Sequence, residues 1–548
     1  MARRPVDIDV AVVGAGFSGL YMLYRLRGMG LRARVFERGS DVGGTWFWNR
    51  YPGARCDIES VDYCYSFSAE LLDGWAWTER YATQPEILRY LHHVADRFDL
   101  RRDIQTGTRV ASVHYDEPGN RWLVSTDAGE TVSARHCVLA VGNLSSVKRP
   151  DFPGLDGFRG DWYHTAQWPP GGVDFRGKRV GVVGTGSTAI QALPQIAKQA
   201  DRVYVFQRTP NYSMPAQNRP LPADELREVL KGYGERRRAA QQSDAGVPVA
   251  APQRSALEVS PQERRRMYEA GWRRGGINAL SYAFTDFFTD ERANFTAQEF
   301  AREKIRETVR DPAVAQILSP VHHIGTKRTC VDIGYFETYN RDHVELVDVR
   351  AAPVTSVTPG GLATTAGEYA LDAIVFAIGF DAITGALLEI DVRGRDGRSL
   401  AEAWSHGPRT YLGLCVTGFP NLFMITGPGS PSVLSNMVVS IEQHVDWIAG
   451  CLGYLEDRGL DRVEPAAGAE AAWGRHVTGL ADRTLYPRAA SWYVGANIPG
   501  KPRVFMPYVG GCGRYRSECD EVVERGYAGF VLGDGRPTPA IATPPAPF

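Results

Sequence analysis

Two segments of the chain share one pattern of apolar and small residues, and they lie 170 residues apart. Residues 10–19 read VAVVGAGFSG, and residues 180–189 read VGVVGTGSTA. Each segment begins with a short continuous apolar run, which predicts a strand buried on both faces of a parallel sheet. A glycine-rich turn and a helical pattern follow in both. The chain therefore contains a repeated strand-turn-helix unit.

The small residues of both turns have the GxGxxG spacing of a dinucleotide-binding loop. The first position allows the tight turn, the second lets the backbone approach a pyrophosphate, and the third packs the helix against the strand. The N-terminus of the following helix offers free N–H groups to the anion. These positions are Gly14, Gly16 and Gly19 in the first unit, and Gly184, Gly186 and Ala189 in the second.

The residue that ends the second strand of each unit indicates which dinucleotide binds. Glu37 follows Gly14 by 23 residues, and Gln207 follows Gly184 by the same interval. An acidic residue here accepts hydrogen bonds from an adenosine ribose, whereas a neutral residue beside an arginine accommodates a 2′-phosphate. We therefore predict FAD at the first unit. At the second, where Arg208 follows Gln207, we predict NADPH in preference to NADH, with electrons passing to the flavin.

The predicted fold class is α/β, with two Rossmann-like dinucleotide-binding domains (FAD and NADP) and a helical insert. The insert's charged, helix-forming sequence includes arginine runs at 236–238 and 264–266, which we expect to be solvated. Earlier in the chain, Thr83 and Glu86 predict a capping box. The expected division is 1–148 (FAD-binding domain, first part), 149–219 (NADP-binding domain, first part, with a linker), 220–327 (helical insert), 328–386 (NADP-binding domain, second part), 387–534 (FAD-binding domain, second part) and 535–548 (disordered proline-rich tail).

Length, charge and cysteine content narrow the class of protein. At 548 residues the chain is too long for one domain, and its net charge of -1 provides no excess of cations for a nucleic acid. No apolar run approaches the roughly 18 residues that a membrane-spanning helix needs. The eight cysteines include no CxxC pair and no zinc spacing. We expect a cytoplasmic monomer or weak oligomer with reduced thiols and no metal, binding neither nucleic acid nor membrane.

A longer fingerprint lies between the two units. Residues 158–169 read FRGDWYHTAQWP, which matches the pattern FxGxxxHxxxW(P/D). Flanked by two dinucleotide motifs, this stretch resembles the fingerprint of the type I Baeyer-Villiger monooxygenases, a flavin-containing family. Other stretches resemble the same family, in particular its members that oxidise phenylacetone and steroids: 43–60, 325–328, 427–432 and 490–493. The resemblance covers about residues 7 to 532.

The resemblance implies an oxidoreductase that uses FAD, NADPH and O2 to convert ketones to esters or lactones, with sulfides as further substrates. In such enzymes reduced flavin and O2 form a C4a-peroxide, which must stay an anion to attack the carbonyl carbon. A fixed cation favours this anion and the negative adduct that follows. Arg328 matches the family's active-site arginine, and Asp57 matches the carboxylate that positions it. Contact between them rests on the resemblance alone.

Other positions match residues that surround the two cofactors in the family. Lys327 and Arg208 match cations at the 2′-phosphate, and Trp492 matches a residue near NADP and substrate. For His164, in the linker, the resemblance implies a part in domain motion, and a plain hydrogen-bonded histidine is the alternative. The expected cofactor-binding set is Gly14, Gly16, Ser18, Gly19, Glu37, Gly44, Thr45, Trp46, Asp57, Tyr63, Gly184, Thr185, Gly186, Ser187, Thr188, Gln191, Arg208, Thr209, Lys327, Arg328, Met437 and Trp492.

Three alternatives to ketone oxidation stay open. A flavin N- or S-hydroxylating monooxygenase would share both dinucleotide folds, although the fingerprint and Arg328 argue against it. A disulfide reductase needs vicinal cysteines, which this sequence lacks. A non-catalytic NADP(H)-binding flavoprotein would not need Arg328 and Asp57. Asn143 and Val433 differ from the phenylacetone-oxidising member where its ketone pocket lies, so the sequence predicts the reaction type and leaves the ketone open.

Overall fold

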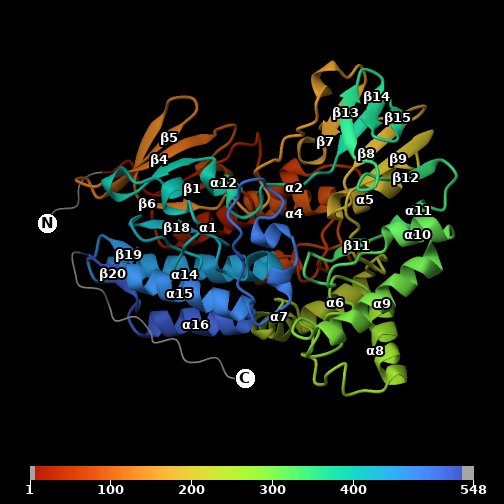
Figure 1. Ribbon diagram of the computed structural model, residues 1–548. Coiled ribbons are helices and arrows are strands. Elements are labelled where there is room, and N and C mark those ends of the chain that lie inside the picture. Colours follow the sequence, from red (N-terminus) through yellow and green to blue (C-terminus); the bar gives the residue numbers. More distant parts are fainter. Residues whose placement is uncertain (1–5, 534–548) are drawn as a thin grey trace.

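The computed structural model describes residues 6–533; the tail predicted to be disordered, residues 535–548, lies outside this range. Two sheets lie side by side, each flanked by helices, and a helical region lies beneath the second sheet (Figure 1). The predicted α/β class is confirmed. Within the described range no helix is both long enough and apolar enough to cross a membrane. All eight cysteines are buried and unbonded to one another.

The first sheet is built around the first glycine loop. Strand β1 lies between β2 and β6, and each of its residues is buried, as its apolar run predicts. Strands β3, β2, β1, β6 and β18 are parallel, and an antiparallel ribbon of β5 and β4 extends this sheet to β17. The strands are β1 (Ile8–Val13), β2 (Ala33–Phe36), β3 (Ile104–Gln105), β4 (Val110–Asp116), β5 (Arg121–Thr126), β6 (Thr131–Leu139), β17 (Asp391–Arg393) and β18 (Leu422–Met424). The last two strands return from the second half of the chain.

The second sheet is fully parallel, in the order β12-β9-β8-β16-β7. Its central strand β8 precedes the second glycine loop, and its edge strand β7 is formed by part of the linker fingerprint. The strands are β7 (Asp161–His164), β8 (Arg179–Val183), β9 (Arg202–Gln207), β12 (Val344–Asp348) and β16 (Ala373–Phe376). A small antiparallel sheet of β13 (Val354–Thr358), β14 (Gly361–Thr364) and β15 (Gly367–Ala370) lies beside it (Figure 1).

Helices connect and cover these sheets. Helix α1 (Phe17–Gly28) follows the first glycine loop and packs against α14 (Met437–Asp457), while α5 (Ser187–Ile196) follows the second loop. Helices α15 (Ala467–Ala481) and α16 (Cys512–Glu524) lie with α14 below the first sheet (Figure 1). The pair β10 (Ser213–Pro215) and β11 (Cys330–Asp332) joins the chain before and after the helical region. The helical region contains α6 (Ala223–Lys231), α7 (Tyr233–Gln242), α8 (Pro261–Arg274), α9 (Glu291–Thr308) and α10 (Pro312–Leu318).

The expectation that arginines 236–238 are solvated is wrong for two of them. Arg237, in α7, has a side chain only 6% exposed and donates to the Glu442 carboxylate of α14 at 2.6 Å. Arg236 makes two 2.7 Å bonds to the carboxylate of Asp62. The physical reason is that α7 packs against α16 and faces the first sheet's helices rather than water. Arg238 is exposed, as expected.

The predicted capping box at Thr83 is also wrong. Helix α4 (Gln84–Arg97) does begin after Thr83, but the Thr83 side chain makes no capping bond. The carboxylate of Glu86 instead accepts bonds from the backbone N–H and the hydroxyl of Thr78, at 2.8 and 2.9 Å. Because the Glu86 carboxylate bonds with Thr78, it does not make the reciprocal bond to the Thr83 backbone that a capping box requires.

Candidate functional site

A cavity of about 1030 Å³ extends between the carboxyl ends of β1 and β8 and is lined by both glycine loops. Every residue of the expected cofactor-binding set lines it except Gly19. A Cβ on Gly19 would lie 1.8 Å from the carbonyl oxygen of Gly14, so Gly19 is the position where α1 packs closely on the strand. The two sets of residues predicted from the repeat therefore face one continuous space.

The flavin end of the cavity is shaped by close backbone approach. Gly14 has a φ of +105°, and a Cβ there would lie 2.6 Å from the carbonyl oxygen of Ala140. Gly44, on the following turn, lies so near Gly16 that a Cβ added to Gly44 would lie 2.8 Å from the Gly16 Cα. Trp46 then donates from its indole nitrogen to the Tyr63 hydroxyl at 3.2 Å. These glycines leave a narrow backbone cradle at the start of α1, which fits the pyrophosphate of FAD.

Glu37 lies at the end of β2, where an acidic residue is expected to meet the ribose. Its carboxylate accepts backbone N–H bonds from Ala15 at 2.7 Å and from Gly39 at 2.6 Å, one on each oxygen. A carboxylate offers about four lone-pair sites, so capacity remains for ribose hydroxyls. Glu37 thus fixes the glycine loop and also lines the cavity.

The NADP end repeats this design with a looser second position, because a Cβ on Gly186 would meet no atom within 4 Å among the described residues. Gly184 has a φ of +114°, and a Cβ there would lie 2.4 Å from the carbonyl oxygen of Ala377. The Thr185 hydroxyl donates to the Thr209 carbonyl at 2.8 Å, which ties the loop to the end of β9. Gln191, on α5, accepts from the Tyr51 hydroxyl at 2.8 Å and donates to the Arg55 carbonyl at 3.1 Å. Gln191 therefore connects the NADP loop's helix to the flavin side.

Arg208 and Lys327 lie on this end of the cavity, as the sequence suggests, whereas Gln207 does not line it. The Gln207 side chain is buried and donates to the Ile317 carbonyl at 2.8 Å. Burial and the nearby charge of Arg208 lower the pKa of Lys327. Within residues 6–533 neither cation forms an ion pair with a carboxylate, so together they form a site that favours a dianion such as a 2′-phosphate.

Asp57 and Arg328 meet although 271 residues separate them. The guanidinium donates from Nε to one carboxylate oxygen at 2.8 Å and from Nη2 to the other at 2.9 Å. Its Nη1 donates to the Val433 carbonyl at 2.6 Å. Burial opposes the charge on the guanidinium, but the Asp57 carboxylate outweighs burial and raises the pKa of Arg328. The side chain is therefore a fixed, permanent cation between the two glycine loops.

His164 is not placed for proton transfer. It ends β7, is 2% exposed, and its Nδ1 accepts from the Ala166 backbone N–H at 3.1 Å. Burial lowers the pKa of His164 to about 4, so the imidazole is neutral at physiological pH. Among residues 6–533 no group of three or more His, Cys, Asp or Glu side chains is arranged to hold a metal ion.

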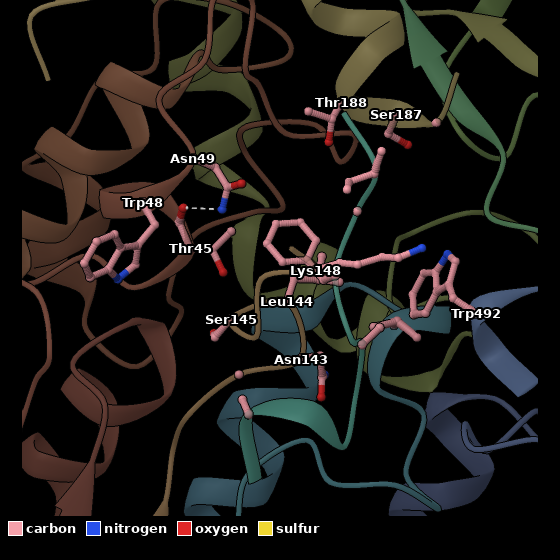
Figure 2. Close-up of a pocket in the computed structure, with 18 of the residues that line it drawn as sticks. Thr45, Trp48, Asn49, Asn143, Leu144, Ser145, Lys148, Ser187, Thr188 and Trp492 are labelled. Carbon is pink, nitrogen blue, oxygen red and sulfur yellow. Dashed lines mark hydrogen bonds between the residues drawn. The ribbon is translucent and has the colours of Figure 1, made fainter. Parts of the chain in front are cut away.

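Several lining residues carry no motif and were missed by sequence reasoning. Lys148 reaches into the cavity from the linker after the first sheet, on the side from which Trp492 enters (Figure 2). Asn49 bonds back to the Thr45 carbonyl at 3.0 Å (Figure 2). Asn143, noted only as a departure, donates to the Ser432 hydroxyl at 2.7 Å. No local pattern could have found Lys148, because its neighbours in space come from distant segments.

Comparison with known proteins shows the family to which this chain belongs. The family model described as flavin-binding monooxygenase-like matches residues 7–224. A "Baeyer-Villiger monooxygenase" of Pseudooceanicola batsensis is 43% identical over 528 residues, covering 96% of each chain. The chain belongs to the Baeyer-Villiger monooxygenases. An "acetone monooxygenase (methyl acetate-forming)" of Gordonia sp. strain TY-5 is 42% identical over 528 residues, 96% of this chain and 99% of the relative.

A solved structure, "oxidized steroid monooxygenase bound to NADP", agrees with this chain over 96% of its length and 100% of the other, with 55% identity and a TM-score of 0.93. The predicted dependence on FAD and NADPH and the oxidoreductase class are confirmed by this membership. A "phenazine N-monooxygenase" of Lysobacter antibioticus is 40% identical over 534 residues, 96% of this chain and 97% of the relative. The choice between ketone and nitrogen oxidation therefore depends on the site.

Proposed function

We propose that this protein uses NADPH and O2 to insert one oxygen atom beside the carbonyl of a ketone, giving an ester or lactone, and that Arg328 is its catalytic cation. Sulfides are further substrates under the same proposal. Bound FAD supplies the redox chemistry with NADPH and O2. The chain's own residues bind both cofactors, orient them towards one space and stabilise negative charge there.

One observation carries the proposal: the guanidinium of Arg328 is fixed and still has donors to offer. Three of its five N–H groups are used, two on Asp57 and one on the Val433 carbonyl. Two remain for an oxyanion, and the charge is present at any working pH. A preorganised cation aimed at developing negative charge favours attack on a carbonyl, which passes through an oxyanion. A nitrogen or sulfur atom that accepts oxygen creates no such oxyanion on the substrate, so this site favours the ketone, and sulfides are secondary substrates.

The other residues have binding roles in the proposal. The first glycine loop and Glu37 hold the FAD pyrophosphate and ribose, and Arg208 with Lys327 holds the 2′-phosphate of NADPH. Trp492 and Met437 line the same cavity and in this proposal border the space between the two cofactors. The proposal also includes the six-part division of the chain given above. It further includes a cytoplasmic location and a monomeric or weakly oligomeric state.

A substrate panel with a variant tests the proposal. Aryl, cyclic and steroidal ketones, an aryl sulfide and phenazine are each incubated with NADPH and O2, and products one oxygen heavier are identified by mass spectrometry. We expect esters or lactones from at least one ketone class. Arg328→Ala should still let NADPH bleach the flavin but form no ester. Oxygenation of phenazine alone, or ester formation by Arg328→Ala at the wild-type rate, would overturn the assignment.

A further inference from the structure

Lys148 occupies a position in the cavity that neither glycine motif nor fingerprint accounts for. It lies at the junction between the sheets, next to Val147, which makes a backbone bridge to Phe380 of the second sheet's side. Its side chain is partly buried and lines the same cavity as Arg208 and Lys327. Burial and the charge of Arg208 lower the pKa of Lys148, so the two cations lie close enough to repel.

Arg208, Lys148 and Lys327 line one cavity, and the charge of Arg208 lowers the pKa of both lysines. None of the three side chains forms an ion pair with a carboxylate within residues 6–533. Cations at the other end of this sheet behave differently, because Arg179 pairs with Asp372 at 2.8 Å. An anion of more than one charge, bound among the three side chains, would relieve the repulsion that Arg208 exerts on both lysines.

Lys148 also contacts the segment that carries Trp492. Its Nζ donates to the backbone carbonyl of Asn497 at 3.3 Å. The Asn497 side chain in turn donates to the Phe380 carbonyl at 2.7 Å, and Lys501 donates to the Ala382 carbonyl at 3.0 Å. One ammonium group thus connects the cation cluster to the backbone of this segment, which we define as residues 490–501.

We propose that Lys148 is the third cation of the NADPH 2′-phosphate site and that it couples the bound nucleotide to the segment 490–501. This inference rests on the phosphate site of the proposed function. The ammonium has three donors, of which one is used by the Asn497 carbonyl, so two remain for phosphate oxygens. Because NAD+ lacks the 2′-phosphate, Lys148 acts as a specificity-determining residue for NADPH over NADH.

Nucleotide affinity of the FAD-loaded protein tests the phosphate contact. Dissociation constants for NADP+ and NAD+ are measured by perturbation of the flavin spectrum, at one fixed ionic strength. Lys148→Gln should weaken NADP+ binding about tenfold, the effect of losing one charge-assisted hydrogen bond, and change NAD+ binding less than twofold. Lys148→Arg should restore most of the loss. Lys198→Gln, an exposed lysine at the end of α5, is the matched control and should change neither constant.

The outcomes separate this inference from the proposed function. If Arg208→Gln weakens NADP+ selectively and Lys148→Gln does not, or weakens both nucleotides equally, the role of Lys148 is overturned and the phosphate site remains. If Arg208→Gln also fails to discriminate, the phosphate site itself is wrong. Retained flavin in each variant shows that the fold is intact.

Hydrogen exchange tests the coupling to the segment. NADP+ should slow amide exchange in residues 490–501 of the wild-type protein, and Lys148→Gln at saturating NADP+ should lose most of this protection. Lys148→Arg should keep it. Equal protection in the wild type and in Lys148→Gln would overturn the coupling.

Discussion

Replacing Asp57 by alanine isolates the part of the site that positions Arg328. The variant removes two hydrogen bonds, of 2.8 and 2.9 Å, and leaves the guanidinium with its hydrogen bond to the Val433 carbonyl and its contact with the Tyr493 hydroxyl. The charge stays in place, but the orientation of the guanidinium is less restricted. The two side chains are 22% and 20% exposed, so water can enter the vacated space.

The size of the effect follows from these contacts. A hydrogen bond to a charged group contributes about 1.5–3 kcal/mol net, and removing one partner of a fully buried pair costs about 3–5 kcal/mol. Because this pair is about one-fifth exposed, we take about 3 kcal/mol as the loss of transition-state stabilisation. At about 1.4 kcal/mol for each factor of ten, ester formation should slow roughly 100-fold.

Two measurements separate chemistry from binding. Anaerobic stopped-flow absorbance gives the rate of flavin reduction by NADPH, which should stay within about threefold of the wild type because both glycine loops are intact. Product analysis then gives ester formed per NADPH consumed, which should collapse. Asp372→Ala is the matched control, since it removes a carboxylate that likewise accepts two side-chain bonds from one arginine, Arg179, at the exposed end of the second sheet. Ester formation by Asp57→Ala within fivefold of the wild type would refute the positioning role.

The remaining predictions concern stability. Arg237→Met leaves Glu442 buried without its cation, at a cost of roughly 3–5 kcal/mol, so the Tm should fall by several degrees; adding Glu442→Leu should recover most of it, and no recovery would contradict the pairing. Burial raises the pKa of Asp332 from 3.8 to about 6. The native state then holds this proton more tightly than the unfolded state, so the stability that Asp332 contributes at low pH is lost between pH 4 and 6. Asp332→Asn should therefore gain on the wild type by roughly 3 kcal/mol across that window in urea titrations, and a pH-independent difference would exclude this assignment.

The repeated units could be predicted because their signals are local. A buried strand, a tight glycine turn and the residue at the next strand end all lie within about thirty residues, and each answers to a steric or hydrogen-bonding requirement. Gly14, Gly19 and Glu37 accordingly lie where the spacing puts them. The meeting of Asp57 with Arg328 has no local signal and needed the family resemblance.

What the sequence missed depends on tertiary contact. Arg237 reads as a surface residue in a charged helix, and only the packing of α7 against α16 turns it inward. Glu86 has the spacing of a capping box, but Thr78 offers it two donors from a neighbouring turn. In the sequence Lys148 is an ordinary linker lysine. Its bond to the Asn497 carbonyl and the effect of the Arg208 charge on its pKa arise only in the folded chain. In each case the position of the partner residue is determined by the folded backbone, and no local sequence pattern specifies it.

The two arginine pairs of α7 also bear on how this enzyme can change through recombination. Arg236 and Arg237 form hydrogen bonds with the carboxylates of Asp62 and Glu442, which lie in other parts of the chain. Asp62 follows Asp57 by only five residues. If a helical region without these arginines replaced this one, the buried carboxylates of Asp62 and Glu442 would lose their cationic partners. The helical region therefore cannot be exchanged without regard to these two acids. A productive chimera has to exchange Asp62 and Glu442, at two places outside the helical region, together with that region.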